Sequence, residues 1–453
     1  MNLISQFFFL ALLVSCGYII YRRINFIKRN ISLGKKSYSS KSDKETRLKN
    51  LLLVAFGQSK MFKKIIPAIL HLMIYLGFII INIEIIEIIL DGILGRHRIF
   101  LELGMPYYNV FISIIEFFIV LVLISCIIFL IRRNVLKIKR FKSPELKGWP
   151  FLDANLILIF EIILMIAILT MNATDLVLQD LNEYNKTGSF YFSSFIKPLF
   201  IGVNISNLII IERVAWWIHI IGILLFAIYV SYSKHLHIFL AFPNIYHSND
   251  QELGKMNNMK SITNEINVMM GKPSEDNQQD VPTRFGVKDV EDLSWKNILD
   301  AYSCSECGRC TSVCPPNITG KKLSPRKIMM DVRDRAEEIG NKIDKNKKYD
   351  DKSLVGDYIT YEEIFACTSC NACVEECPLN INPLDIILES RRYSALEESN
   401  LPNEWNSMLQ NVETNFSPWK FPIDQRGDWY KKESESGSDP SKVYLNSGFP
   451  MEL

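Results

Sequence analysis

The sequence predicts a mainly α-helical protein, with a bundle of five transmembrane helices in its first half and a helical, polar domain in its second half. Three observations lead to this prediction. Five stretches each hold about 20 mainly apolar residues, the length that crosses a bilayer as a helix. The residues after 242 are polar, and they contain eight of the ten cysteines in two copies of one spacing. The formal net charge is only +2, and we expect no nucleic-acid partner.

The apolar stretches predict membrane spans at about residues 3–21, 64–90, 108–131, 151–171 and 213–240. The loops after the first and third spans are rich in lysine and arginine, whereas the other two loops contain few basic residues. By the positive-inside rule, the N-terminus lies outside the cell and the C-terminal half lies in the cytoplasm. We therefore expect a multi-pass protein of the bacterial cell (inner) membrane that contacts lipid.

Changes in composition along the chain predict four regions. They are a transmembrane domain (1–242), a linker rich in Asn, Lys and Met (243–290), a helical cysteine-bearing domain (291–395) and a polar C-terminal tail (396–453). Within the third region, Ser324-Pro325 predicts a helix start, and Thr360-Tyr361-Glu362-Glu363 predicts a capping box. A lipoprotein cleavage site ending at Cys16 is an alternative for the N-terminus, but no basic residues precede that apolar stretch, which continues beyond the cysteine.

The eight cysteines of the polar half form two runs of the pattern C-x2-C-x2-C-x3-C-P. The first run is Cys304, Cys307, Cys310 and Cys314, and the second is Cys367, Cys370, Cys373 and Cys377. A reducing cytoplasm disfavours disulfides. Zinc is the alternative metal, but zinc ribbons use pairs of CxxC separated by a longer insert, and here the third and fourth cysteines follow at once.

The spacing is typical of ferredoxins with two [4Fe-4S] clusters, in which the fourth cysteine of each run binds the other cluster. This predicts one cluster on Cys304, Cys307, Cys310 and Cys377, and another on Cys367, Cys370, Cys373 and Cys314. Adjacent clusters of this kind carry single electrons. A fully ligated cluster offers no open coordination position, so we expect a conduit for electrons rather than a catalytic metal.

Histidines in the apolar half suggest a second kind of redox centre. His219 and His237 are 18 residues apart in the predicted fifth span, which is five full turns, so both are expected on one helix face about 27 Å apart. His71 lies near the cytoplasmic start of the second span, at the depth expected for His237. Two facing imidazoles hold a b-type haem, and we predict one on His71 and His237.

Two other histidines are weaker candidates. His235 is expected on the opposite helix face from His237, because it lies two residues away. His219 is a candidate ligand for a second haem, with His97 in the external loop as a speculative partner. Alternatively, the histidines of the bundle are polar residues that hydrogen bond within it.

These motifs carry resemblances to known families. The cysteine-bearing region resembles the helical dicluster domain of succinate dehydrogenase iron-sulfur subunits and of the C subunit of heterodisulfide reductase. The five spans and the His219/His237 spacing resemble the gamma subunit of respiratory nitrate reductase, a quinol-oxidising cytochrome b, although Ile81 stands where that family has a histidine. "HLMIYLGF" and "WWIH…SKHLHIF…FPN" resemble bacterial fused cytochrome b and iron-sulfur proteins related to heterodisulfide reductase.

The resemblance implies an oxidoreductase that exchanges electrons between menaquinone or menaquinol and a cytoplasmic redox partner, through haem b and the two clusters. In those families the partner often carries CCG-type cysteine domains. This chain has no adjacent cysteine pair, so we expect a separate iron-sulfur or CCG-domain protein to act on any soluble substrate. The alternatives are a membrane-anchored iron-sulfur redox sensor and a non-catalytic anchor or relay subunit of a larger reductase.

Quinone chemistry moves protons as well as electrons, and four carboxyl groups lie within the predicted spans. An ionisable group at such depth is costly and is a functional candidate. The four are Glu84, Glu87, Glu116 and Glu161. The alternative is that they are protonated, hydrogen-bonded packing residues, and the sequence singles out none of them as the quinone base.

Overall fold

The computed structural model describes residues 3–36, 43–96, 98–136, 138–188, 190–249, 252–272 and 284–428. His97, residues 250, 251 and 273–283 of the predicted linker, and residues 429–453 of the predicted tail lie outside these ranges. The chain divides into two compact units, Met1–Ser390 and Arg391–Leu453. The described residues are mainly helical and form no strand, only two isolated bridges, Lys35 with Ser294 and Val355 with Ile359.

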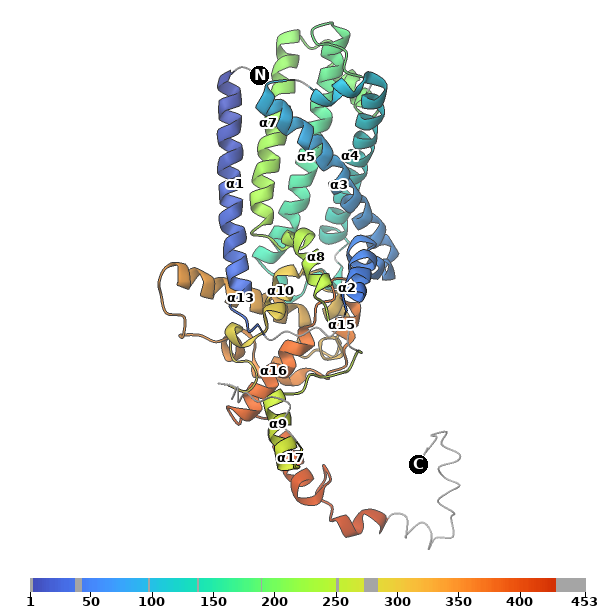
Figure 1. The fold of residues 1–453 in the computed structure, drawn as a ribbon. Helices are drawn as coiled ribbons and strands as arrows, with labels where there is room; N and C mark the ends of the chain where they lie inside the picture. Colours follow the sequence, from blue (N-terminus) through green and yellow to red (C-terminus); the bar gives the residue numbers. More distant parts are fainter. Residues whose placement is uncertain are drawn as a thin grey trace, which may run out of the picture. The chain divides into compact units, whose positions relative to one another are not determined.

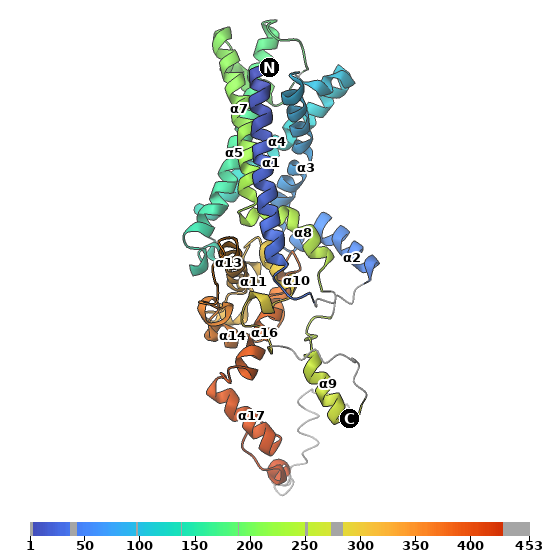
Figure 2. The ribbon, with the colours of Figure 1, turned by 60° about the vertical axis from the view of Figure 1, so that its left-hand side comes forward.

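Five long apolar helices form the first half of the larger unit, as the sequence predicts. They are α1 (Leu3–Ile31), α3 (Ile65–Leu94), α4 (Met105–Asn134), α5 (Trp149–Asp180) and α7 (Ile205–Val230), and each is long and apolar enough to cross a membrane. They run side by side in Figures 1 and 2. A helix satisfies its own backbone hydrogen bonds, which lipid cannot do, so long apolar stretches adopt this structure.

Close contacts between helices depend on small residues at the interfaces. A Cβ atom on Gly77 of α3 would lie 2.3 Å from a methyl carbon of Val122 on α4, and one on Gly222 of α7 would lie 2.7 Å from Leu164 on α5. The core between the helices is aliphatic, and Ile119 is fully buried in it. Small residues let helix backbones approach, which is how transmembrane helices gain packing energy without a hydrophobic driving force.

The predicted fifth span, 213–240, is wrong at its C-terminal end. Helix α7 ends at Val230, and a turn leads into the short 3-10 helix η7 (Lys234–Leu236) and then into α8 (His237–Tyr246). Ser231 Oγ donates to the carbonyl of Ile228 at 2.7 Å, and Ser233 Oγ accepts from the N–H of His235 at 3.1 Å. Serine side chains compete in this way with the helical backbone, and here they end the helix.

The cysteine-bearing region is a set of short helices. They are α10 (Trp295–Ser303), α11 (Arg309–Ser312), α12 (Pro315–Ile318), α13 (Pro325–Asp344), α14 (Tyr361–Ala366), α15 (Ala372–Glu376) and α16 (Pro383–Leu396). Ser324 caps α13 with proline at its first position, and a capping box of Thr360 and Glu363 begins α14, so both predicted helix starts are confirmed.

Four other helices complete the described fold. The short helices α2 (Lys44–Asn50), α6 (Ser193–Ile196) and α9 (Lys260–Met269) belong to the larger unit. Helix α17 (Asn403–Asn415), in the smaller unit, buries none of its residues.

The cysteine-bearing helices lie at the end of the bundle where α1 finishes and α3 begins, which we call the proximal end; the opposite end is the distal end (Figure 2). Arg23 of α1 forms an ion pair with Glu337 of α13 at 2.8 Å. Asn30, also on α1, is buried and donates to the hydroxyl of Tyr302 on α10 at 2.9 Å. The bundle and the cysteine helices therefore share a polar, buried interface within one unit.

Candidate functional site

The two cysteine runs have the same local structure. In each run the first cysteine is the C-cap of a helix, Cys304 after α10 and Cys367 after α14. The last cysteine of each run is followed by proline. Both preceding helices start with a capping box, so the sequence fixes where each helix begins and where its cysteine leaves it.

Between the first and third cysteines, both loops turn by means of left-handed residues at equivalent positions. Two residues after the first cysteine stand Glu306 (φ 54°) and Ser369 (φ 53°), and four residues after it stand Gly308 (φ 71°) and Asn371 (φ 60°). Alternating left- and right-handed conformations curve the backbone into a concave loop with its N–H groups facing inward. In the second loop, the N–H of Ser369 donates to a sulfur, Cys367 Sγ, at 3.4 Å.

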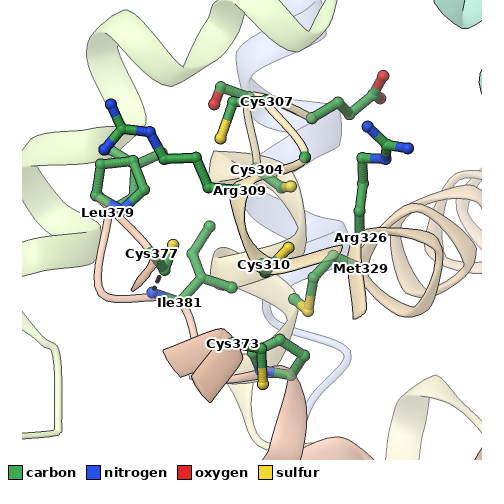
Figure 3. Close-up of a pocket in the computed structure, with 15 residues that line it drawn as sticks. Cys304, Cys307, Arg309, Cys310, Arg326, Met329, Cys373, Cys377, Leu379 and Ile381 are labelled. Atoms are coloured by element: carbon green, nitrogen blue, oxygen red, sulfur yellow. Dashed lines mark hydrogen bonds between the residues drawn. The ribbon is translucent and has the colours of Figure 1, made fainter. Parts of the chain in front are cut away.

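The first cavity is lined by cysteines from both runs. Cys304, Cys307 and Cys310 of the first run meet Cys377 of the second run around it, and Cys373 lies at its edge (Figure 3). The N–H of Ile381 donates to Cys377 Sγ at 3.4 Å. The other lining side chains are both apolar, among them Met329 and Ile381, and charged, among them Arg309 and Arg326.

A second cavity has the complementary set of cysteines. Cys367, Cys370 and Cys373 of the second run meet Cys314 of the first run around it. Cys373 borders both cavities, which makes the cavities neighbours. Cys370 is exposed to solvent, whereas Cys304 and Cys314 are buried. The structure thus brings together the two groups of four cysteines that the crossed pattern predicts.

Burial makes these thiols poor acids on their own. Burial first, and neighbouring cysteines second, together raise the pKa of Cys304, Cys373 and Cys377 to about 12 each. Thiolates are the form that binds iron, so the sites need a strongly positive group to hold four of them. Among the described residues, no three His, Cys, Asp or Glu side chains converge as the ligands of one ion would. Sulfur atoms placed around a cavity suit a cluster larger than a single ion.

Buried ion pairs fix the loop of the first cavity to the proximal end of the bundle. Glu306, 6% exposed, pairs with Lys234 of η7 at 2.7 Å and with Arg333 of α13 at 2.9 Å. Lys234 also lies 3.7 Å from Asp153 of α5. The first cysteine loop is therefore connected through charged side chains to two helices of the bundle region.

Arg309 makes a second connection between the first cavity and the bundle. It lines the cavity, is 2% exposed, and donates to the backbone carbonyls of Lys60 and Met61 at 3.0 and 3.1 Å. Those residues belong to η2 (Ser59–Lys63), the 3-10 helix that leads into α3. Sequence reasoning missed Glu306 and Arg309, because their spacing within a cysteine run carries no signal of contacts with residues so distant in the chain.

The histidines at the proximal end gather more closely than the sequence predicts. His71 Nδ1 lies 3.0 Å from the side-chain oxygen of Gln58, and His237 Nδ1 lies 3.0 Å from the carbonyl of Lys234. His71 and His237 are close enough for a charge on one ring to affect the other. The expectation that His235 lies on the opposite face from His237 is wrong, because the chain leaves the α-helix at Val230; the two rings are 5.3 Å apart between centroids.

His219 lies deeper in the bundle, on α7. It is 1% exposed, its Nδ1 lies 3.0 Å from the carbonyl of Leu164, and its Nε2 has no hydrogen-bond partner among the described residues. The argument that His219 and His237 share one helix face does not hold, since they belong to different helices. In each of His71, His219 and His237, an oxygen lies within hydrogen-bond distance of Nδ1. When Nδ1 carries the proton for that bond, the lone pair of Nε2 is left to bind a metal.

Comparison with known proteins supports the iron-sulfur interpretation. The family model of the 4Fe-4S dicluster domain matches residues 303–381, which include all eight cysteines. A probable iron-sulfur-binding oxidoreductase, FadF of Bacillus subtilis, is 29% identical over 93% of this chain and 60% of its own length. EtfAB:quinone oxidoreductase of Syntrophomonas wolfei is 25% identical over 84% of this chain and 54% of its own length.

Shorter matches point the same way. The C subunit of a CoB-CoM heterodisulfide reductase from Methanosarcina acetivorans is 33% identical over 31% of this chain and 73% of its own length. The comparison with solved structures gave no significant match. The chain spans little more than half the length of the first two relatives, to which it is similar along most of its own length. It is thus related to iron-sulfur oxidoreductases and contains a 4Fe-4S dicluster domain.

Proposed function

We propose that this protein is a membrane-bound oxidoreductase subunit that transfers electrons between menaquinone or menaquinol and a cytoplasmic redox partner. The observation that carries the proposal is the pair of neighbouring cavities at one end of five membrane-length helices. Cysteines from both runs line each cavity, and Cys373 borders both. The named activities of its relatives support it, since one is a quinone oxidoreductase and another a probable membrane-anchored ferredoxin.

In this proposal, Cys304, Cys307, Cys310 and Cys377 hold one [4Fe-4S] cluster, and Cys314, Cys367, Cys370 and Cys373 hold the other. Bound clusters supply one-electron oxidation and reduction. The protein's own contribution is the N–H groups of Ser369 and Ile381, which donate to ligand sulfurs, and the buried arginines Arg309 and Arg326 beside the first cavity. Such hydrogen bonds stabilise negative charge on sulfur and so adjust the reduction potential.

His71 and His237 are the proposed ligands of a haem b at the proximal end. Their Nδ1 atoms each face an oxygen, so Nε2 is the nitrogen available to iron. His219 is the candidate for a second haem, supported by its buried Nε2 without a hydrogen-bond partner among the described residues. With the cysteine region in the cytoplasm, as the charge of the loops predicts, this haem would lie on the cytoplasmic side of the membrane.

The proposed soluble partner is a separate redox protein. The name of one relative pairs EtfAB with quinone, so a flavoprotein of that kind is the first partner to test. The four-region division, with 1–242 as the membrane domain and 291–395 as the cluster domain, is part of the same proposal. An anchor or relay role without its own substrate site is the second candidate function, favoured by the similarity to a probable membrane-anchored ferredoxin.

Spectroscopy of the purified full chain tests the proposal. A dithionite-reduced minus oxidised spectrum is expected to show b-haem bands, and iron and acid-labile sulfide are expected to be about four of each per cluster. A menaquinol analogue is expected to reduce the haem. Haem bands without reduction by quinol would favour the relay role, and bound zinc without sulfide would refute the cluster assignment.

A further inference from the structure

The distal end of the bundle contains a buried polar network built around one cation. Arg98, in the α3–α4 connection, is 6% exposed and has a left-handed backbone (φ 57°). Its Nε and Nη2 donate to Asp175 of α5 at 3.2 and 3.0 Å, Nη2 donates to Asn172 at 2.8 Å, and Nη1 donates to the Tyr108 hydroxyl at 3.1 Å. The guanidinium is thus held in one orientation by three neighbours.

Most of the acidic groups in this network are also hydrogen bonded. Glu87 accepts from the N–H of Phe100 at 3.0 Å and from the Tyr108 hydroxyl at 3.1 Å. Glu116 of α4 accepts from the N–H of Phe192 at 2.7 Å and from the side chains of Asn172 and Ser193.

Glu84 differs from its neighbours. It is 1% exposed, and neither of its carboxyl oxygens has a hydrogen-bond partner among the described residues. It interacts electrostatically with Arg98 and with the like charges of Glu87 and Glu116. An ionised carboxylate without a hydrogen bond in such a place costs several kcal/mol, so burial selects the protonated form.

The balance of charge leads to the same result. Glu84, Glu87, Glu116 and Asp175 are each no more than 2% exposed. The buried cation Arg98 binds Asp175 and acts electrostatically on Glu84 and Glu87. No three acidic, histidine or cysteine side chains among the described residues are placed to bind a metal ion. A proton is therefore the remaining means of neutralising Glu84, whose carboxyl oxygens no described residue engages.

The position of Glu84 connects the bundle interior to its distal surface. Glu84, Glu87 and Asp91 are spaced i, i+3 and i+7 on α3, so they follow one another along one face over about 10 Å. Asp91, at the outer end of this row, is partly exposed and accepts from the N–H groups of Arg98 and Ile99 at 2.7 and 3.0 Å. We call these three residues the α3 carboxyl row.

We propose that Glu84 is a proton carrier that exchanges protons between the bundle interior and water at the distal end through the α3 carboxyl row. This inference rests on the proposed quinone function. Oxidation of one quinol to quinone releases two electrons and two protons. The electrons would pass to the iron centres that the proposed function assigns to this chain, and the two protons, one from each quinol hydroxyl, would follow this route one after the other. Glu84 gives its proton toward Glu87 and Asp91 and is reprotonated by the quinol hydroxyl. Reduction of quinone uses the route in reverse.

The test compares Glu84→Gln with Glu102→Gln in full-length protein reconstituted into lipid vesicles. Glu102 is 68% exposed in the same distal connection and pairs with Arg96, so its variant is the matched control. Glutamine keeps the size of the protonated side chain but releases no proton. We expect reduction of the iron centres by a menaquinol analogue to slow on the order of a hundredfold in Glu84→Gln, with iron content unchanged, and to stay at the wild-type rate in Glu102→Gln.

A second measurement does not depend on quinone. The infrared spectrum of the resting protein should contain the carbonyl stretch of a protonated carboxyl group that shifts in D2O, and Glu84→Gln should remove that component. Asp91→Asn changes the surface end of the row and should keep this infrared band but slow quinol oxidation. This variant therefore tests the proton route even if Glu84→Gln fails to assemble. An unchanged infrared spectrum in Glu84→Gln, or a wild-type rate in either row variant, overturns the inference. A wild-type protein that quinol does not reduce refutes the proposed function instead, while the infrared result still decides whether Glu84 holds a proton.

Discussion

Removing two cysteines from the same cavity should destroy one cluster and spare the other, and the structure specifies which pairs share a cavity. Cys304 and Cys377 line the first cavity although 73 residues separate them, whereas Cys304 and Cys314, in the same run, line different cavities. If instead each run held its own cluster, the same pairs of substitutions would give the opposite result.

Two [4Fe-4S] clusters contain about eight iron atoms per chain. The double variant Cys304→Ala/Cys377→Ala removes two ligands from the first cavity and none from the second, so it should retain about four iron atoms and four sulfides. Cys304→Ala/Cys314→Ala removes one ligand from each cavity and should perturb both clusters. Cys314→Ala/Cys367→Ala is the matched control for the second cavity and should again retain about four iron atoms.

These outcomes are measured by the iron and acid-labile sulfide content per chain and by electron paramagnetic resonance of the dithionite-reduced protein. The first and third variants should each give the spectrum of one isolated cluster, and the two spectra should differ because the cavities have different linings and exposure. If Cys304→Ala/Cys314→Ala retains one intact cluster while Cys304→Ala/Cys377→Ala retains none, each run holds its own cluster and the crossed assignment is wrong. Circular dichroism of each variant shows whether the helices remain folded.

Three further perturbations test the interface and the charges around the cysteine helices. Lys234→Met removes one of the two cations that pair with the buried Glu306, while Arg333 remains, and should cost about 2 kcal/mol, seen as a lower midpoint of thermal unfolding. Lys322→Met removes an exposed pair and should change nothing measurable. A hydrogen bond from Tyr358, together with basic neighbours, lowers the pKa of Glu338 to about 2. The ionised Glu338 therefore stabilises the fold fully above its ordinary pKa of 4.5, and this stabilisation is lost as the pH falls toward 2. Glu338→Gln should flatten the pH dependence of the thermal unfolding midpoint between pH 4.5 and 2. Gly340→Ala places a methyl group 2.3 Å from the side-chain oxygen of Asn30 and should destabilise the α1–α13 contact by about 1–3 kcal/mol, as the same thermal measurement would show.

Much of the architecture follows from local signals that a single sequence carries. Stretches of apolar residues predict the five long helices, since lipid leaves the backbone no other partner. The starts of α13 and α14 follow from capping residues such as Ser324 and Thr360, which satisfy N–H groups within one turn. The prediction of two crossed cysteine sets rests on the spacing within each run, because that spacing is typical of ferredoxins in which the fourth cysteine binds the other cluster.

Features that depend on tertiary contacts were not predictable in the same way. The predicted fifth span runs across the polar residues 231–235. The hydrogen bonds of Ser231 and Ser233 accompany the end of α7, and the turn that follows brings His235 beside His237. Arg98 reads as one of a few basic residues in an external loop, yet it folds back into the bundle and pairs with Asp175. Glu212 lay just outside the predicted fifth span and was missed; it is 2% exposed and pairs with Arg213.

The order of the candidate redox sites restricts where a soluble partner can exchange electrons. The charge of Arg309 acts on the His71 ring, and Arg309 lines the first cavity, so the proposed haem site and the first cavity are neighbours at the bundle. Cys373 borders both cavities, and the second cavity includes the exposed Cys370. Buried ion pairs of Glu306 hold the first loop against the bundle. Under the proposed function, electrons tunnel efficiently only over short distances. A partner protein would therefore approach the second cavity at the exposed Cys370, and the first cavity would be the step between the second cavity and the membrane.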